Sequence, residues 1–326
     1  MNLRATIEQS PNRRYIMFGG KGGLGKTTFS AATAYWLASH GHRVLVFSVD
    51  PQASLSDIFQ RDIFGKGPVK ITDNLWAQEI DADRHILEYQ NEIRAKIMKK
   101  YGFDEVPDEI EQYIRAASAE PAMEESAIFD AVVDIVVQGE YDYYIYDLVP
   151  LGHALYYLSM AKVYDEWINK ITRLRQEMRE YEEMVSRLKR QKETEEDEIL
   201  AELIYIKGRI NASSGILTDR EKTAFFFVLI PEKMILLDTA KAAGLFAQFD
   251  VPIAGYVVNR VVPHDLLGQN IPAYLRRRIE MQDGYLREIR DTFGEQVLAT
   301  VPELESDVTG LPMIERLAHI MFENGR

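Results

Sequence analysis

A glycine-rich run occupies positions 19–28 and reads Gly19-Gly20-Lys21-Gly22-Gly23-Leu24-Gly25-Lys26-Thr27-Thr28. It fits the pattern G-x-x-x-x-G-K-[ST], in which backbone N–H groups surround phosphate oxygens and a helix N-terminus adds partial positive charge. The required context is present as well, because 14–18 reads as a short buried strand and 28–39 has apolar residues at helical spacing. The sequence therefore predicts a strand, a phosphate-binding loop and a helix, in that order.

Two side chains of this loop carry specific chemistry. Lys26 is expected to reach the β- and γ-phosphates of a nucleotide, and the Thr27 hydroxyl is expected to bind Mg²⁺. The predicted nucleotide-binding residues in the loop are Gly20, Lys21, Gly22, Gly23, Leu24, Gly25, Lys26, Thr27 and Thr28.

The second lysine of the loop, Lys21, produces the form K-G-G-x-G-K-T-T. This form resembles the deviant phosphate loop of the ATPases related to MinD, ParA, nitrogenase iron protein, the arsenite-pump ATPase ArsA and the GET-pathway ATPase that targets tail-anchored proteins. In these ATPases the extra lysine reaches across a dimer interface to the partner's nucleotide. The resemblance implies ATP and Mg²⁺ as ligands and a nucleotide-controlled homodimer.

The composition is that of an ordinary soluble globular protein, with 326 residues of which 46% are hydrophobic and 27% are charged. A formal net charge of −13 argues against nucleic acid or anionic lipid as a broad-surface partner. No apolar run approaches the ~18 residues of a spanning helix, so we expect a cytoplasmic protein with no stable membrane insertion. The absence of cysteine excludes disulfides, thiolate metal sites and iron–sulfur ligation.

An aspartate, Asp50, ends the strand predicted at 43–49. In open α/β sheets, ligands bind at the carboxyl ends of strands. By the resemblance, Asp50 polarises the attacking water, and the following Ser54-Leu55-Ser56-Asp57 is similar to the first switch of the GET ATPase, which makes Asp57 a switch residue. From its position alone, Asp50 could instead only cap the next helix. The predicted catalytic residues are Lys21, Lys26 and Asp50.

A second aspartate, Asp147, ends another buried strand, and the chain continues Leu148-Val149-Pro150-Leu151-Gly152-His153-Ala154-Leu155. This stretch resembles the second switch D-T-A-P-T-G-H-T-L of the ArsA and GET group, with leucine at two threonine positions. The resemblance implies that Asp147 holds Mg²⁺ through water, beside Thr27, and that Gly152 and His153 belong to a moving segment. Read without the resemblance, Asp147 could be purely structural and His153 a packed side chain.

Two more residues are expected on the adenine side of the nucleotide. Asn259 follows the strand predicted at 252–258 and matches the asparagine that reads the adenine edge in this family, since an amide can donate and accept at once. A turn residue is the alternative. The segment 302–312 resembles the adenine-side loop of the ArsA and GET group, which adds Pro302 to the ATP-binding residues.

The segment before the later strands has apolar residues at alternating three- and four-residue steps. It predicts two long antiparallel helices, about 161–191 and 195–211, with a charged tip. The resemblance places the client-binding helical subdomain of the GET ATPase here. Five methionines could line a flexible apolar groove or only fill the seam of the helices, and the pattern leaves both open. They are Met98, Met123, Met160, Met178 and Met184.

The alternation of strands and helices predicts an α/β fold, with a mostly parallel sheet, helices on both faces and an inserted helical subdomain, as in P-loop NTPases. We expect the ATPase domain at 13–82, 139–158 and 216–326, and the helical subdomain at 83–138 and 159–215. The segment 75–80 is expected to be an edge strand.

Three functions remain open at this point. The first is a Mg-dependent ATPase whose homodimer binds and targets a hydrophobic, tail-anchored client and meets a membrane receptor; the cysteine pair that binds zinc at the GET dimer interface is missing here. The second is the ATPase subunit of an arsenite, antimonite or other anion pump, which the lack of cysteine disfavours. The third is a ParA- or MinD-like positioning switch, favoured by Asp50-Pro51-Gln52 but opposed by the net charge and the long helices.

Overall fold

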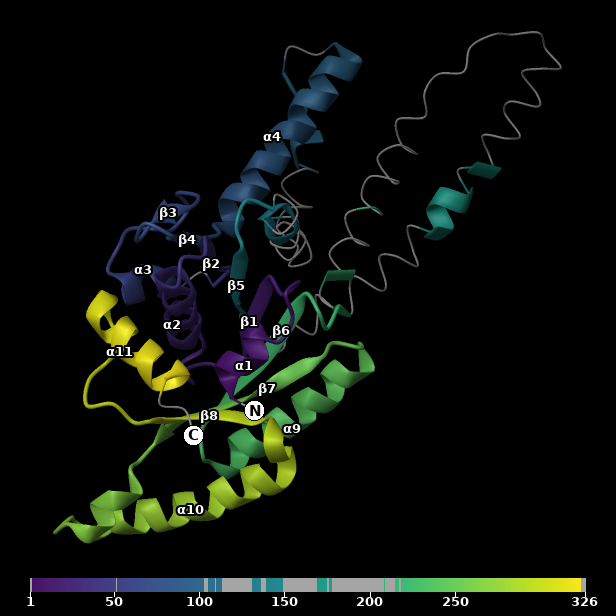
Figure 1. Ribbon diagram of the computed structural model, residues 1–326. Helices are drawn as coiled ribbons and strands as arrows, with labels where there is room; N and C mark the ends of the chain where they lie inside the picture. The colour runs from purple at the N-terminus through teal and green to yellow at the C-terminus, as the bar shows by residue number, and fades with distance from the viewer. Residues whose placement is uncertain are drawn as a thin grey trace.

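The computed structural model describes residues 2–50, 52–102, 105–108, 110–112, 131–135, 139–148, 169–174, 176–177, 208, 215–216 and 218–323. Its centre is an eight-stranded sheet with the order β3-β4-β2-β5-β1-β6-β7-β8 (Figure 1). The strands are β1 Tyr15–Gly19, β2 Val44–Ser48, β3 Val69–Lys70, β4 Leu75–Glu79, β5 Tyr143–Asp147, β6 Thr223–Leu229, β7 Ile253–Val261 and β8 Val297–Pro302. The helices are α1 Leu3–Glu8, α2 Lys26–Ser39, α3 Ser54–Phe59, α4 Ala82–Tyr101, α9 Lys233–Gln248, η1 His264–Gly268, α10 Ala273–Phe293, η2 Gly294–Gln296 and α11 Gly310–Phe322.

All pairings between neighbouring strands are parallel except that of β3 with β4, which is antiparallel. The predicted α/β class with a mostly parallel sheet is therefore confirmed. One detail is wrong, because β3 pairs with β4 and takes the edge position expected for 75–80. A strand of two residues is too short to leave a periodic signal in the sequence.

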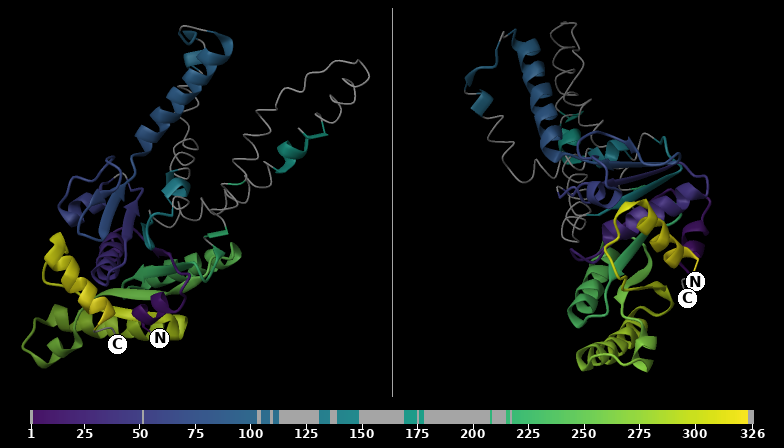
Figure 2. Two further views of the ribbon diagram at one scale, coloured as in Figure 1. Left: turned by 45° about the horizontal axis from the view of Figure 1, so that its top comes forward. Right: turned by 90° about the vertical axis from the view of Figure 1, so that its left-hand side faces the viewer.

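The helices cover both faces of the sheet. The connection from β1 through α2 to β2 runs toward one edge, whereas those from β6 through α9 to β7 and from β7 through α10 to β8 run toward the other. Because parallel crossovers are right-handed, α2 lies on one face and α9 and α10 on the opposite one. The last helix, α11, packs against α2, and two views from different sides agree with this layering (Figure 2).

The core follows from this double coverage. Every residue of β1, β2 and β6 is buried, as expected for strands with a helical layer on each face. Phenylalanines fill much of the space between sheet and helices, and Phe18 stacks on Phe226 with 5.5 Å between ring centroids. The glycine-rich loop and the aspartates therefore extend from strand ends that the core holds in place.

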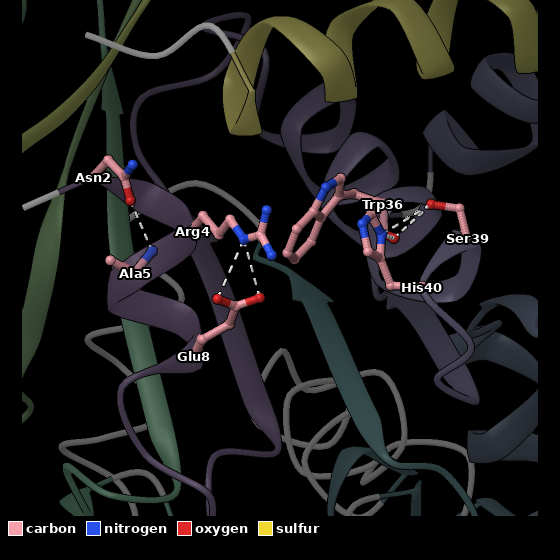
Figure 3. A network of polar contacts seen from close by, with 7 residues as sticks. All are labelled: Asn2, Arg4, Ala5, Glu8, Trp36, Ser39 and His40. Carbon is pink, nitrogen blue, oxygen red and sulfur yellow. Dashed lines mark hydrogen bonds and ion pairs between the residues drawn. The ribbon is translucent and has the colours of Figure 1, made fainter.

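The first helix, α1, was not expected from the polar stretch that opens the chain. Its N-terminus is capped by Asn2, whose Oδ1 accepts from the Ala5 N–H at 2.8 Å (Figure 3). The Arg4 guanidinium lies 5.4 Å from the ring centroid of Trp36 on α2 and pairs with Glu8. Phe322 of α11 stacks on the same indole with 4.4 Å between centroids. Trp36 thus joins three helices from both ends of the chain.

The helix α4 leaves the sheet and projects away from it (Figure 1). Asp81 caps its start and Gly102, in the left-handed region with φ 67°, ends it. Of the predicted helical pair at 161–191 and 195–211, residues 169–174 are helical, and most of the remainder lies outside the described residues. The same is true of Met123, Met160, Met178 and Met184. Within the described part of the chain, no helix combines the length and apolarity needed to cross a membrane.

Candidate nucleotide-binding site

The glycine-rich loop connects β1 directly to α2. Gly20, Gly23 and Gly25 have φ of 152°, 76° and 99°, which non-glycine residues rarely adopt. A Cβ atom at Gly20 would lie 2.5 Å from the carbonyl oxygen of Val228, and one at Gly25 would lie 2.7 Å from Nδ2 of Asn259. The glycines therefore let the loop turn back over the sheet edge, with the N-terminus of α2 behind it.

The sheet register brings both aspartates to the same edge. Asp147, the last residue of β5, is paired with Phe18 of β1 on one side and with Ser48 of β2 on the other. Asp50 follows Ser48 by two residues, and its N–H donates to the Ser48 hydroxyl at 3.1 Å. The carboxylates predicted from two distant parts of the sequence therefore meet beside the loop.

Lys26 is the first residue of α2 and is buried, with 8% of its surface exposed. Its Nζ donates to the carbonyl oxygen of Lys21 at 3.4 Å, so the side chain folds back along the loop. Burial lowers the pKa of the Lys26 ammonium, and the nearby negative charges of Asp147 and Asp50 oppose that shift. A phosphate group at the loop would supply further negative charge to keep this ammonium protonated.

Asp147 is 2% exposed, and burial raises the pKa of its carboxyl group to about 7. A hydrogen bond from Thr27, the charge of Lys26 and the Ser30 hydroxyl, 3.5 Å from Oδ1, oppose this rise. A buried carboxylate with incomplete charge compensation next to a threonine hydroxyl offers the hard oxygen ligands that Mg²⁺ prefers. Thr27 and Asp147 therefore fit a magnesium ion, the latter through water.

Asp50 is partly buried and lies in a turn at the end of β2. Its Oδ1 accepts from the N–H of Gln52 at 3.0 Å, a local bond that shapes the turn. This bond precedes α3, whose N-cap residue is Ala53 and lacks a side-chain cap, so the alternative that Asp50 caps this helix is wrong. Because a carboxylate can accept up to about four hydrogen bonds, the turn and a contact with water are compatible.

The side chain of Lys21 is paired with a residue of a helix outside the loop. Its Nζ pairs with Oδ2 of Asp238 on α9 at 3.1 Å, and the two side chains are 56% and 39% exposed. An ion pair this exposed contributes little to stability. The side chain is thus held at the surface by a contact that costs little to break.

Asn259, near the end of β7, contacts the loop from the opposite side. Its Nδ2 donates to the carbonyl oxygen of Leu24 at 2.8 Å, and its Oδ1 accepts from the N–H of Arg260 at 2.8 Å. An amide group has a second N–H and a second lone pair, so a purine edge can still be bound. Pro302 ends β8 and pairs with Val261, which places it beside the same strand end.

Residues 13–323 match the model of a protein family described as "Anion-transporting ATPase". The chain belongs to the ArsA_ATPase family. The predicted family is therefore confirmed, and with it the expectation that the protein is an ATPase.

Known members of this ATPase family resemble the chain over almost its whole length. Two proteins of Aquifex aeolicus, provisionally named arsenical pump-driving ATPases 2 and 1, are 29% and 33% identical over 94% and 95% of this chain and 99% and 78% of their own lengths. ATPase GET3C of Arabidopsis thaliana is 28% identical over 95% of this chain and 83% of its own length. Both kinds of name that the sequence suggested thus occur among relatives of similar identity.

The structure brings together most of the residues predicted for the ATPase site. The loop residues 20–28, Asp50, Asp147 and Asn259 gather at the carboxyl edge of the sheet. Asp57 is exposed on α3, whereas Gly152 and His153 lie outside the described residues.

Sequence reasoning missed three side chains around this site. Ser30 approaches Asp147, Asp238 pairs with Lys21, and Glu79, only 1% exposed, bonds to the start of α3. A signal for Glu79 existed, because alternation in β4 places it on the same buried face as Leu75 and Ala77. A carboxylate on a buried strand face requires hydrogen-bond partners, so its position alone makes it a candidate for a structural or functional contact.

Proposed function

We propose that this ArsA_ATPase family member hydrolyses ATP at the carboxyl edge of its sheet. The observation that carries the proposal is the buried Lys26, set at the start of α2 within the field of Asp147 and Asp50. In phosphoryl transfer, catalysis consists mainly of positioning and charge stabilisation. Lys26 and the loop N–H groups bind the phosphates, and Asp50 orients the attacking water.

Two further groups complete the proposed site. Thr27 and Asp147 hold Mg²⁺, which when bound supplies charge neutralisation at the phosphates. Asn259, with Pro302 beside it, binds the adenine while its Nδ2 keeps the loop fixed through Leu24. The adenine and the phosphates are thereby bound by two parts of the chain, the end of β7 and the glycine-rich loop, which contact each other.

We also propose that nucleotide controls a homodimer. Lys21 is exposed, and among the described residues its ammonium forms a surface ion pair with Asp238, so a partner subunit's nucleotide can attract it at small energetic cost. Asp57, Gly152 and His153 are proposed to belong to the segments that respond to the nucleotide.

The proposed role of the dimer is to bind hydrophobic, tail-anchored membrane-protein segments. Similarity to ATPase GET3C and ATPase GET3A of Arabidopsis thaliana, each 28% identical, supports it, as does the absence of cysteine, the thiolate ligand that arsenite prefers. The second candidate is the ATPase of an anion pump. It is supported by the names of the Aquifex aeolicus relatives.

Phosphate release from ATP tests the enzymatic proposal. The wild type is expected to hydrolyse ATP with Mg²⁺ and not with EDTA, and Lys26→Ala and Asp50→Asn are expected to lower kcat by ~100-fold or more. Only Asp50→Asn should retain nucleotide affinity, because it leaves the phosphate cradle intact. An Asp50→Asn protein as active as the wild type would remove Asp50 from the mechanism.

Co-purification tests the role. The ATP-bound Asp50→Asn protein is mixed with a tail-anchored transmembrane segment, and the control is the same segment with its leucines made polar. A soluble, nucleotide-dependent complex with the apolar segment alone supports targeting. No complex, together with ATPase activity stimulated by arsenite or antimonite, supports the pump instead.

A further inference from the structure

Glu79, the last residue of β4, has a buried carboxylate that forms three hydrogen bonds to one short helix, α3. Its Oε1 accepts from the N–H of Leu55 at 2.6 Å and from the N–H of Ser56 at 3.2 Å. Its Oε2 accepts from the Ser56 hydroxyl. The side chain therefore satisfies backbone donors at the start of α3 that no residue of the helix itself caps.

The Ser56 hydroxyl extends this anchor past the end of the helix. Its oxygen accepts from the N–H of Ile63 at 3.2 Å, while the Glu79 carbonyl accepts from the N–H of Gly65 at 3.1 Å. The start of α3 and the chain after it are thus both tied to Glu79. The carboxylate fixes where α3 begins on the sheet, and the backbone carbonyl holds the chain that follows.

Asp50 lies at the other end of this segment. Ser48, whose hydroxyl accepts from the N–H of Asp50, is the direct sheet partner of Glu79. From Asp50 the chain passes into α3 through Ala53, a non-glycine residue with φ 52° that persists only where its surroundings hold it. Asp50 and α3 are therefore held at neighbouring strand ends, Asp50 by Ser48 and α3 by Glu79.

We infer that Glu79 is a positioning residue for hydrolysis: by capping α3 from β4, it holds Asp50 in the place where its carboxylate can orient the attacking water. The inference rests on the proposed ATPase function and adds a residue to it. The carboxylate of Glu79 is buried and directed to α3, so its loss is expected to change the chemical step and to leave the phosphate cradle on α2 unaffected.

The test compares three variants of the full chain. Glu79→Met removes the acceptor at similar length, and Glu79→Gln retains an oxygen for the two N–H groups. Arg13→Met is the matched structural control, because Arg13 is also buried and donates to the carbonyl oxygens of Thr6 and Arg220, ahead of β1 and β6 and away from the loop. For each, kcat and KM for MgATP and the urea unfolding midpoint are measured.

Glu79→Met is expected to lower kcat by roughly 10- to 100-fold with KM within about threefold, because a displacement of about 1 Å at a reacting group has effects of this size. Glu79→Gln is expected to restore most of kcat, and Arg13→Met to lower the unfolding midpoint without lowering kcat. A Glu79→Met enzyme with wild-type kcat overturns the inference, as does an equal loss in Arg13→Met.

Two further measurements keep the result decisive. If Glu79→Met does not fold, Ser56→Ala removes one of the three bonds, and an unchanged kcat in that variant overturns the inference. If the wild type hydrolyses no ATP, the proposed function fails, and amide exchange then tests the anchor alone. Exchange at Leu55 and Ser56 is expected to accelerate in Glu79→Gln less than in Glu79→Met; equal protection in the wild type and Glu79→Met overturns it.

Discussion

At the scale of single residues, the buried carboxyl of Asp147 makes the stability of the nucleotide-free protein depend on pH. The pKa of this carboxyl is about 7 in the folded chain and 3.8 in the reference state, so the folded protein keeps the proton to a higher pH than the unfolded one. The contribution of Asp147 to stability is therefore fully present below about pH 4 and is lost as the pH rises through 7.

Asp147→Asn is expected to remove this dependence. Between the two pKa values the wild type should lose up to about 1.4 kcal/mol of unfolding free energy per pH unit from this group. Urea unfolding from pH 4 to 8 in EDTA measures the slope for both proteins. Identical slopes in the wild type and Asp147→Asn would show that burial does not hold the proton on this carboxyl.

The pair of Lys21 with Asp238 separates stability from activity. Both side chains are more than one-third exposed, so Asp238→Asn is expected to change the free energy of unfolding by no more than ~0.5 kcal/mol. Lys21→Ala should be as stable as the wild type. It should lower ATP hydrolysis by ~100-fold or more, because the positive charge that stabilises the transferring phosphate is lost. Wild-type hydrolysis by Lys21→Ala would exclude a catalytic task for this lysine.

At the scale of elements, the turn from β1 into α2 depends on one backbone conformation. Gly25 has φ 99°, and a Cβ atom there would meet the amide of Asn259. Gly25→Ala is expected to cost roughly 2–3 kcal/mol through backbone strain and displacement of β7. Gly22→Ala is the control, because nothing lies within 4 Å of its Cβ position. Its cost should stay within about 1 kcal/mol, and urea unfolding that shows equal costs would contradict this account.

Strands with a continuous apolar run were predicted to within a few residues. The sequence places strands at 14–18 and 43–49, and the structure has them at Tyr15–Gly19 and Val44–Ser48. Continuous apolar runs suffice here because a parallel sheet buries both of its faces. The helix α1 and the strand β3 were not predicted, because six and two residues are too few to show a periodic pattern.

The positions of the candidate site residues were predictable where a motif carries its own chemistry, as in the loop and at the strand-terminal aspartates. The partners of these residues were not. Asp238 lies 217 positions from Lys21, and Glu79 lies 24 positions from Leu55, so only the fold brings them into contact. Whether Gly152 and His153 act as switch residues stays a prediction.

At the scale of the whole molecule, nucleotide is expected to stabilise the entire sheet. The bond from Asn259 to Leu24 spans 235 positions, so a ligand on both residues joins the two halves of the sheet. With Mg·ADP at 100 times its Kd, the wild type should gain about 2.7 kcal/mol, whereas Lys26→Ala should gain almost nothing at that concentration. Thermal unfolding over a series of ADP concentrations measures this gain, and no gain in the wild type would contradict the proposed site.

The position of β1 in the sheet also sets an order of events during synthesis. β1 leaves the ribosome among the first strands, yet it lies between β5 and β6, and its partner Thr223 is made 208 residues after Tyr15. Until then β1 lacks β6, one of the two strands that flank it, and an unpaired apolar strand edge favours aggregation or chaperone binding. The proposed nucleotide site thus stays incomplete until Asn259 of β7 has been made, and we expect ATP to be retained only by chains that extend past β7.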